Sequence, residues 1–355
     1  MKKLLILSPF LASASVFAEN VVISNSGEYA SAVSDYTFAF QSAGDTLVAD
    51  MDLTGDYGLN YIQGTGSASD SFYISTSKDH ALISASSSNS LLRWGSDGSA
   101  YGSSKGTYNI GENVEVSAQQ NILRNGVAVN VYGKMDNTGS LSMDAGSLVC
   151  VKSGGILSGP LNVWGNAARI VVESGGEAVA PGNAGLAGDN ASVVVEGYFQ
   201  SNSLQMSGTG VLFDVKKGGL AAIVGDVTIG NAGVALYVGG DFNVSGAIKA
   251  LNGESLAIEF TDSAALLTVS DLELGQVDIN GIWGERNLAI ISMTADEIKG
   301  INWFHDGEEL VFGQTYFLLE KSGGGYYFSS VPEPSAFAAV LGLAALALVA
   351  RFGRR

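Results

Sequence analysis

Residues that could carry catalytic or metal chemistry are few in this chain and lie far apart. The two histidines, His80 and His305, are in different regions, and neither has a second histidine, a cysteine or a carboxylate at the spacing of a zinc site. No strand-bound Gly-x-Ser-x-Gly elbow, phosphate-binding loop or His-Glu-x-x-His motif is present. Both histidines are therefore expected to have structural or surface roles.

Two groups of acidic residues match known sites only in part. The segment 50–56 has acidic residues at positions 1 and 3 and a glycine at position 6, as a calcium loop does, but Tyr61 stands where an EF-hand places its bidentate glutamate. The segment 306–309 offers carboxylates that a glycosidase could use. A solvated hairpin turn is favoured there, because catalytic carboxylates need a cleft and a raised pKa. No catalytic, metal or cofactor-binding residue is predicted.

Composition indicates a turn-rich, exported β protein. Of 355 residues 47 are glycine and only 15% are charged, a balance that is typical of extracellular all-β proteins. The formal net charge of −17 disfavours nucleic acids and anionic membrane surfaces as partners. The single cysteine, Cys150, cannot form an internal disulfide and is expected to be a small buried hydrophobe, the alternative being a reactive thiol.

The strongest internal pattern is a repeat over residues 111–280. Short apolar strings end in glycines that follow one another at spacings of 22, 21, 21, 22 and 21 residues, namely Gly133, Gly155, Gly176, Gly197, Gly219 and Gly240. Each period holds a second short strand, and a further glycine between the strands is expected to turn a corner with positive φ, as at Gly146, Gly165, Gly208 and Gly230.

The repeat predicts an all-β fold, a β-solenoid (β-helix) with coils of about 21 residues whose inward side chains stack along the axis. A β-sandwich or barrel is the competing interpretation, since strands separated by turn residues would also suit it. A sandwich, however, has no reason to keep glycines in register over five successive periods.

The regions on either side of the repeat are expected to be less regular. Residues 19–110 alternate apolar strings with turn residues and are predicted to form an irregular β region. Residues 281–330 are predicted to be a C-terminal cap with a capping box at 294–297 and two hairpins. Trp283 and Trp303 are expected to close the solenoid end. For Trp94 and Trp164 two roles stay open, burial in the core and exposure on a surface where the ring stacks on sugars.

The N-terminal residues 1–18 are predicted to be a secretory signal peptide. Two lysines precede an apolar run, and small residues precede a cut between Ala18 and Glu19. Loss of Lys2 and Lys3, together with three arginines of the C-terminal tail, would take the formal charge from −17 to −22. The alternative is a buried N-terminal strand, for which this charge pattern is unusual.

Residues 331–355 have three parts in a fixed order. The first is a Pro-Glu-Pro box made of Val331, Pro332, Glu333, Pro334 and Ser335. An apolar run follows, and the chain ends in a basic tail with Arg351, Arg354 and Arg355. As a helix, residues 335–350 would reach about 24 Å against a hydrocarbon core of about 30 Å, so they form a short transmembrane helix at most. An ordinary single-pass anchor is the alternative.

This three-part segment resembles a PEP-CTERM sorting signal. The resemblance implies recognition by an exosortase, a membrane-embedded, transpeptidase-like cysteine protease of Gram-negative bacteria that removes the tail and releases or transfers the cargo. It also implies a transient stay in the inner membrane, with the arginines on the cytoplasmic side. The repeat body is similar, less specifically, to the autotransporter-type passenger repeats of other PEP-CTERM proteins.

Two functions are carried forward from the sequence. The first is an exported structural or adhesion protein of the cell surface, outer envelope or biofilm matrix, without catalytic activity or cofactor. Signal peptidase and exosortase would process it, and extracellular polysaccharide or host and surface glycans would be its partners. The second is a β-helix enzyme that acts on polysaccharide, a lyase or glycoside hydrolase with charged residues along one solenoid face. Converging carboxylates in a groove would favour the enzyme.

Overall fold

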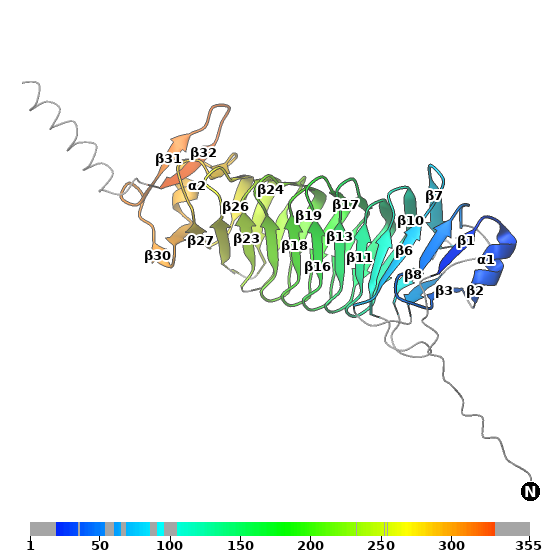
Figure 1. Ribbon diagram of the computed structural model, residues 1–355. Helices are drawn as coiled ribbons and strands as arrows, with labels where there is room; N and C mark the ends of the chain where they lie inside the picture. Colours follow the sequence, from blue (N-terminus) through cyan, green and yellow to red (C-terminus); the bar gives the residue numbers. More distant parts are fainter. Residues whose placement is uncertain are drawn as a thin grey trace, which may run out of the picture.

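The computed structural model of the chain is a long β-solenoid (Figure 1). It describes residues 19–34, 36–53, 60–64, 69–85, 91–95, 105–231, 233–251, 253 and 255–330. The solenoid has about 12 turns and coils of about 22 residues, so the predicted all-β solenoid is confirmed. At roughly 4.8 Å per turn it is on the order of 58 Å long. The predicted signal peptide and the predicted hydrophobic sorting helix lie outside the described residues.

One side of the solenoid is a sheet of 14 short strands, here called sheet A. All neighbours in it pair in parallel except the last two, which form an antiparallel hairpin. In axial order its strands are β1 (Asn20–Ile23), β4 (Thr46–Ala49), β6 (Ser71–Ser75), β9 (Thr107–Ile110), β11 (Ala128–Val131), β13 (Leu148–Val151), β16 (Arg169–Val172), β18 (Ser192–Val195), β20 (Leu212–Val215), β23 (Ala235–Val238), β25 (Leu256–Phe260), β27 (Gln276–Gly281), β29 (Asn302–His305) and β30 (Glu308–Glu309).

The rest of each coil belongs to a second sheet, sheet B, which bends partway along its longer strands. The register of three strand pairs shifts at the bend, and in three other described coils the strand is replaced there by two short ones. The strands of sheet B are β2 (Val33–Ser34), β3 (Thr37–Phe40), β5 (Tyr61–Gly64), β7 (Ala81–Ser84), β8 (Leu91–Trp94), β10 (Val114–Leu123), β12 (Lys134–Met143), β14 (Ile156–Ser158), β15 (Leu161–Val163), β17 (Glu177–Leu186), β19 (Tyr198–Met206), β21 (Leu220–Ile223), β22 (Val227–Ile229), β24 (Asp241–Ala250), β26 (Leu266–Glu273), β28 (Leu288–Ile290), β31 (Tyr316–Glu320) and β32 (Tyr326–Ser330).

Alternating side chains explain why these segments form strands. Along each strand every second residue points into the solenoid, and in-register pairing stacks like positions on one another. One such column in sheet A is fully buried and runs from Ile110 to Phe260 through six successive valines, namely Val131, Val151, Val172, Val195, Val215 and Val238. Burial of each such side chain contributes about 1.5–3 kcal/mol. No coil has a core of its own, so the stack folds as a unit.

The corner glycines serve two different purposes. Gly146 has φ 66°, as expected for a left-handed corner. At Gly165, Gly208 and Gly230 the expected positive φ is wrong. A Cβ on Gly165 would instead lie 2.1 Å from the backbone carbon of Asp144, and one on Gly208 would lie 2.3 Å from the carbonyl oxygen of Gly188. These two glycines are required because neighbouring coils approach too closely for a side chain.

The N-terminal region is more regular than the sequence indicates. Strands β1, β4, β6 and β9 continue sheet A in parallel register, so the solenoid extends well into residues 19–110. The coils there are longer: Asn20 pairs with Thr46, 26 residues on, and Ser71 pairs with Thr107, 36 residues on. The extra residues lie between strands, where they hide the period in the sequence without breaking the stack.

Both ends of the solenoid are capped. At the N-terminal end helix α1 (Ser26–Ala32) begins at the N-cap Asn25 and buries Tyr29. At the C-terminal end helix α2 (Ala295–Lys299) has the predicted capping box, and both predicted hairpins, β29–β30 and β31–β32, are confirmed. Trp303 is 1% exposed and its ring stacks on Phe328 at 4.0 Å, so the predicted aromatic plug is also confirmed.

Candidate functional site

The processing residues predicted from the sequence fall almost entirely outside the described part of the chain. Ala18 does so, as do Val331, Pro332, Glu333, Pro334, Ser335, Arg351, Arg354 and Arg355. Glu19 is described, and its backbone nitrogen lies 2.9 Å from Oδ1 of the buried Asp45. Within the described ranges there is no helix of the length and apolar character needed to cross a membrane.

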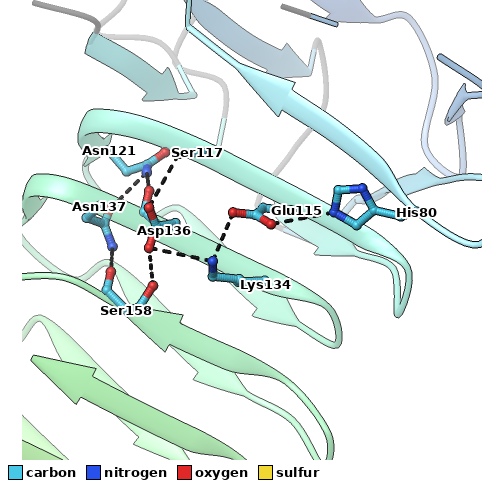
Figure 2. Close-up of polar contacts among 8 residues, drawn as sticks. All are labelled: His80, Glu115, Ser117, Asn121, Lys134, Asp136, Asn137 and Ser158. Atoms are coloured by element: carbon cyan, nitrogen blue, oxygen red, sulfur yellow. Dashed lines mark hydrogen bonds and ion pairs between the residues drawn. The ribbon is translucent and has the colours of Figure 1, made fainter. Parts of the chain in front are cut away.

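A row of charged groups lies on the outer face of sheet B. Figure 2 shows this row at the start of strands β10 and β12, next to His80, which precedes β7. His80 Nε2 lies 3.5 Å from Glu115 Oε2, and the other oxygen of Glu115 lies 2.9 Å from Lys134 Nζ. Lys134 Nζ is also 3.9 Å from Asp136 Oδ1. The row therefore joins three successive coils along the solenoid axis.

Hydroxyl groups extend this row to the next coil. The Ser158 hydroxyl of β14 donates a hydrogen bond to Asp136, and the Ser117 hydroxyl lies 3.4 Å from the other oxygen of Asp136. The hydrogen bond from Lys134 to Glu115 is the main reason that the pKa of Lys134 is raised above its ordinary value. Its ammonium group thus stays protonated at physiological pH, whereas a lysine that acts as a general base needs a lowered pKa. The contacts of this cluster connect neighbouring coils through their side chains.

The same kind of pairing recurs along the body. The other pairs between a carboxylate and a basic side chain in the described solenoid are Arg124–Asp144, Lys152–Glu173, Lys216–Asp214, Lys217–Asp262, Lys249–Asp226 and Lys249–Glu273, at 2.5–3.8 Å. All but Lys216–Asp214 connect different coils. Partly exposed pairs of this kind contribute about 0–1 kcal/mol each. Each of these carboxylates lies against a basic side chain, which is a different arrangement from the converging carboxylates of a glycosidase.

The acidic segments singled out in the sequence have structural partners. Both carboxylate oxygens of Asp50 accept hydrogen bonds from Ser77, and Asp52 accepts one from the Leu82 backbone. Asp306 and Gly307 have φ 50° and 81° and form the turn of the β29–β30 hairpin. Across residues that the structure describes, no group of three metal-ligating side chains comes together.

Cys150 lies on sheet A and is 6% exposed, as predicted for a buried hydrophobe. Its Sγ lies 3.1 Å from Glu173 Oε1, which also accepts the hydrogen bond from Lys152. Burial, with a smaller effect from Glu173, raises the pKa of the Cys150 thiol. Both effects reduce the thiolate fraction at neutral pH and therefore the nucleophilicity of the sulfur.

We therefore expect Cys150 to react slowly with thiol reagents while the protein is folded. At pH 8 the rate of modification by a disulfide reagent should be at least about tenfold lower than for the urea-unfolded chain, because the native thiol is both covered and protonated. Absorbance recorded over time after mixing with the reagent gives the modification rates of the native and the unfolded chain directly. Equal native and unfolded rates would contradict the burial of this side chain.

The interior next to the charged row contains a polar chain that the sequence analysis did not identify. Asn121 and Asn137 are 0% and 1% exposed, and the Asn121 amide donates to Asn137 Oδ1 at 2.8 Å (Figure 2). Asn121 Oδ1 accepts from Trp94 Nε1 at 3.0 Å, and Asn137 donates to the Ser158 carbonyl at 2.8 Å. Asparagine at an inward position next to the bend of two successive strands, just after the bend in β10 and just before it in β12, is a signal that would have indicated this network.

The described surface has two open hollows. One, of about 510 Å³, lies beside β1 and α1, and the other, of about 230 Å³, is lined by Asn243, Thr268, Ser270 and neighbours on β24 and β26. Neither contains a residue of the charged row. Comparison of the chain with protein-family models, with curated proteins and with solved structures finds no match. A function is therefore inferred from residues and geometry.

Proposed function

We propose that this protein is an exported, non-catalytic β-solenoid that serves as a structural or adhesion component of a Gram-negative cell surface or extracellular matrix. One observation carries the proposal: the ion pairs on the described body mostly join neighbouring coils, where each adds modestly to the stability of the rod. Its ends are closed by α1 and by the aromatic plug around Trp303, which prevents edge-to-edge aggregation of an exported β protein.

The surroundings of Glu19 support cleavage of the signal peptide after Ala18. Cleavage there would turn the Glu19 amide nitrogen into an ammonium group 2.9 Å from Asp45 Oδ1. The other oxygen of Asp45 is already held by the backbone N–H groups of Gln41 and Ser42, both at 2.7 Å. A partly buried carboxylate is thus in place to pair with the new positive charge.

The C-terminal part of the proposal is exosortase processing at the Pro-Glu-Pro box, residues 331–335. The apolar run would hold the protein in the inner membrane for a time, with Arg351, Arg354 and Arg355 on the cytoplasmic side. Pro332 and Pro334 favour an extended, accessible backbone at the membrane surface. Release from this anchor would deliver the solenoid to the envelope or the medium.

Intact-mass measurement of the exported protein tests this proposal. In the native strain the mass should correspond to a chain that begins at Glu19 and lacks the residues after the Pro-Glu-Pro box. In an exosortase-deficient strain, and in a Pro332→Ala/Pro334→Ala variant, the tail should remain. An Arg93→Lys variant, altered on the solenoid, is the matched control and should be processed normally. A native product that keeps its tail would refute the sorting proposal.

The enzyme alternative rests on the row of Glu115, Lys134 and Asp136, in which the Lys134 amine has one carboxylate on each side. A polysaccharide lyase or glycoside hydrolase built on this row would lose turnover in Glu115→Gln and Lys134→Met variants. New reducing ends or unsaturated products that appear with the native protein and disappear with these variants would establish the enzyme. The structural proposal expects no product from any of the three.

A further inference from the structure

Trp164 is the most exposed large hydrophobic side chain among the described residues, at 68%. It follows β15 at the corner between sheets B and A. The backbone there is rigid, because the next residue, Gly165, donates to the Met143 carbonyl at 2.8 Å and lies against Asp144 of the preceding coil. A large indole held in water on a rigid corner is typical of a binding hot spot.

The neighbouring coils leave this corner uncrowded. The residue at the same place in the preceding coil, Asp144, is engaged by Arg124 at 3.4 Å. The backbone hydrogen bonds of the next three coils place small residues at this position, namely Ala187, Ser207 and Gly230, and the exposed Leu251 follows only in the fourth. No bulky side chain of those coils therefore competes with a ligand for the space along the axis beyond Trp164.

One column of outward side chains that leads to Trp164 is polar and uncharged. Its positions pair in register from coil to coil and are Ser142, Asn162, Gly185, Gln205 and Thr228. Asn162 is two residues from Trp164, which is about 7 Å along a strand. On the same face, Ser203 donates to Asn183 Oδ1 at 2.7 Å. The charged groups beside the column, Asp144 with Arg124 and Asp226 with Lys249, form ion pairs, and the column itself is uncharged over five successive coils, up to Lys249 in the next one.

An uncharged column stands out on a protein with a formal net charge of −17. Anionic polymers are repelled by the acidic remainder of the molecule. A neutral sugar chain carries hydroxyl groups, which hydrogen-bond to amides and hydroxyls, and apolar C–H faces, which pack on an aromatic ring. The exposed indole and the polar row lie side by side and match these two features.

We propose that Trp164 and the row from Ser142 to Thr228 form a binding surface for an uncharged polysaccharide. The inference rests on the proposed function in that it names the partner class of an adhesion or matrix protein. The polysaccharide would lie across neighbouring coils, with one sugar ring on the indole and its hydroxyl groups on Asn162 and Gln205.

Binding of the purified mature protein to a neutral β-glucan and to neutral dextran, measured by affinity electrophoresis and by titration calorimetry, tests the inference. We expect binding to at least one of them, a loss of affinity of about tenfold or more in Trp164→Ala, and a smaller loss in Trp164→Phe. A Gln205→Ala variant should lose about two- to fivefold. Phe312→Ala removes another exposed aromatic side chain, 46% exposed, and should bind like the native protein.

Several outcomes would overturn the inference. The first is that the native protein binds neither neutral polymer. The second is that Trp164→Ala binds with the same affinity as the native protein. The third is that the protein binds alginate more tightly than the neutral polymers and that this binding does not depend on Trp164. Sedimentation that shows self-association lost in Trp164→Ala would assign the surface to a second copy instead. Thermal melting should be unchanged by Trp164→Ala, since the side chain is exposed. Intact-mass analysis of the tail is independent of these results, so failure of glycan binding and failure of the export proposal are distinguishable.

Discussion

Replacing Gly155 by alanine should destabilise the solenoid much more than replacing the adjacent Gly154. A Cβ on Gly155 would lie 2.0 Å from the Val131 carbonyl oxygen and 3.1 Å from that of Lys152, so two backbone segments would have to move. Gly154 has φ 80° and nothing within 4 Å of its Cβ position. We expect a loss of about 3 kcal/mol or more for Gly155→Ala, at or above the usual range for overpacking, and about 1–2 kcal/mol for Gly154→Ala.

Urea unfolding followed by circular dichroism measures both values, with the slope of the transition checked to be unchanged. The pair Gly218 and Gly219 repeats the arrangement: Gly218 has open space, whereas a Cβ on Gly219 would lie 2.3 Å from the Val195 carbonyl oxygen. The same difference should therefore appear there. If alanine at 154 and 155 cost the same, the spacing of neighbouring coils would not be the reason for the glycine repeat.

Asn121→Leu should be the second strongly destabilising change. Leucine is close to asparagine in size, but it would leave Trp94 Nε1 without an acceptor and remove the amide that donates to Asn137 Oδ1, both in the dry interior. Each buried polar group left unpaired costs about 1–3 kcal/mol. We expect a total loss of about 3–4 kcal/mol.

A double-mutant cycle separates the network from simple packing. In a Trp94→Phe background the indole N–H is gone, so Asn121→Leu should cost about 1–2 kcal/mol less than in the native protein. Asn243→Leu, at an exposed position of β24, is the control and should change stability by less than about 0.5 kcal/mol. Additive effects of the Trp94 and Asn121 substitutions would show that their hydrogen bond contributes nothing.

Much of the fold could be predicted from local patterns. The alternation of apolar residues marks the strands, and glycines at intervals of 21–22 residues mark the coils, because each coil must place a residue without a side chain at the same corner. The two C-terminal hairpins and the capping box at Thr294 are also local features. The N-terminal coils could not be predicted in this way, because extra residues between their strands lengthen the period. These extra residues do not change the strand pairing, such as that of Ser71 with Thr107.

The candidate sites depend on contacts between coils, for which the sequence holds only weak signals. Lys134 meets Glu115 because their strands pair with the two residues opposite each other, 19 positions apart. Without the register of β10 and β12, a lysine and a glutamate at that distance in the sequence could lie on opposite faces. A slip of one residue in a strand moves each of its side chains to the other face.

The two tryptophans that the sequence left open illustrate this division. The amino-acid sequence by itself determined that the chain is a β-solenoid, but it left the roles of both residues open. The register decided the rest. Trp94 stands in one column with Leu123, Met143 and Val163, all of which point inward. Its indole is therefore buried, and its N–H donates a hydrogen bond to Asn121. Trp164 follows Val163 by one residue and therefore points outward, 68% exposed. One position along the strand separates a core residue from a candidate ligand contact, because successive side chains of a strand face opposite sides of the sheet.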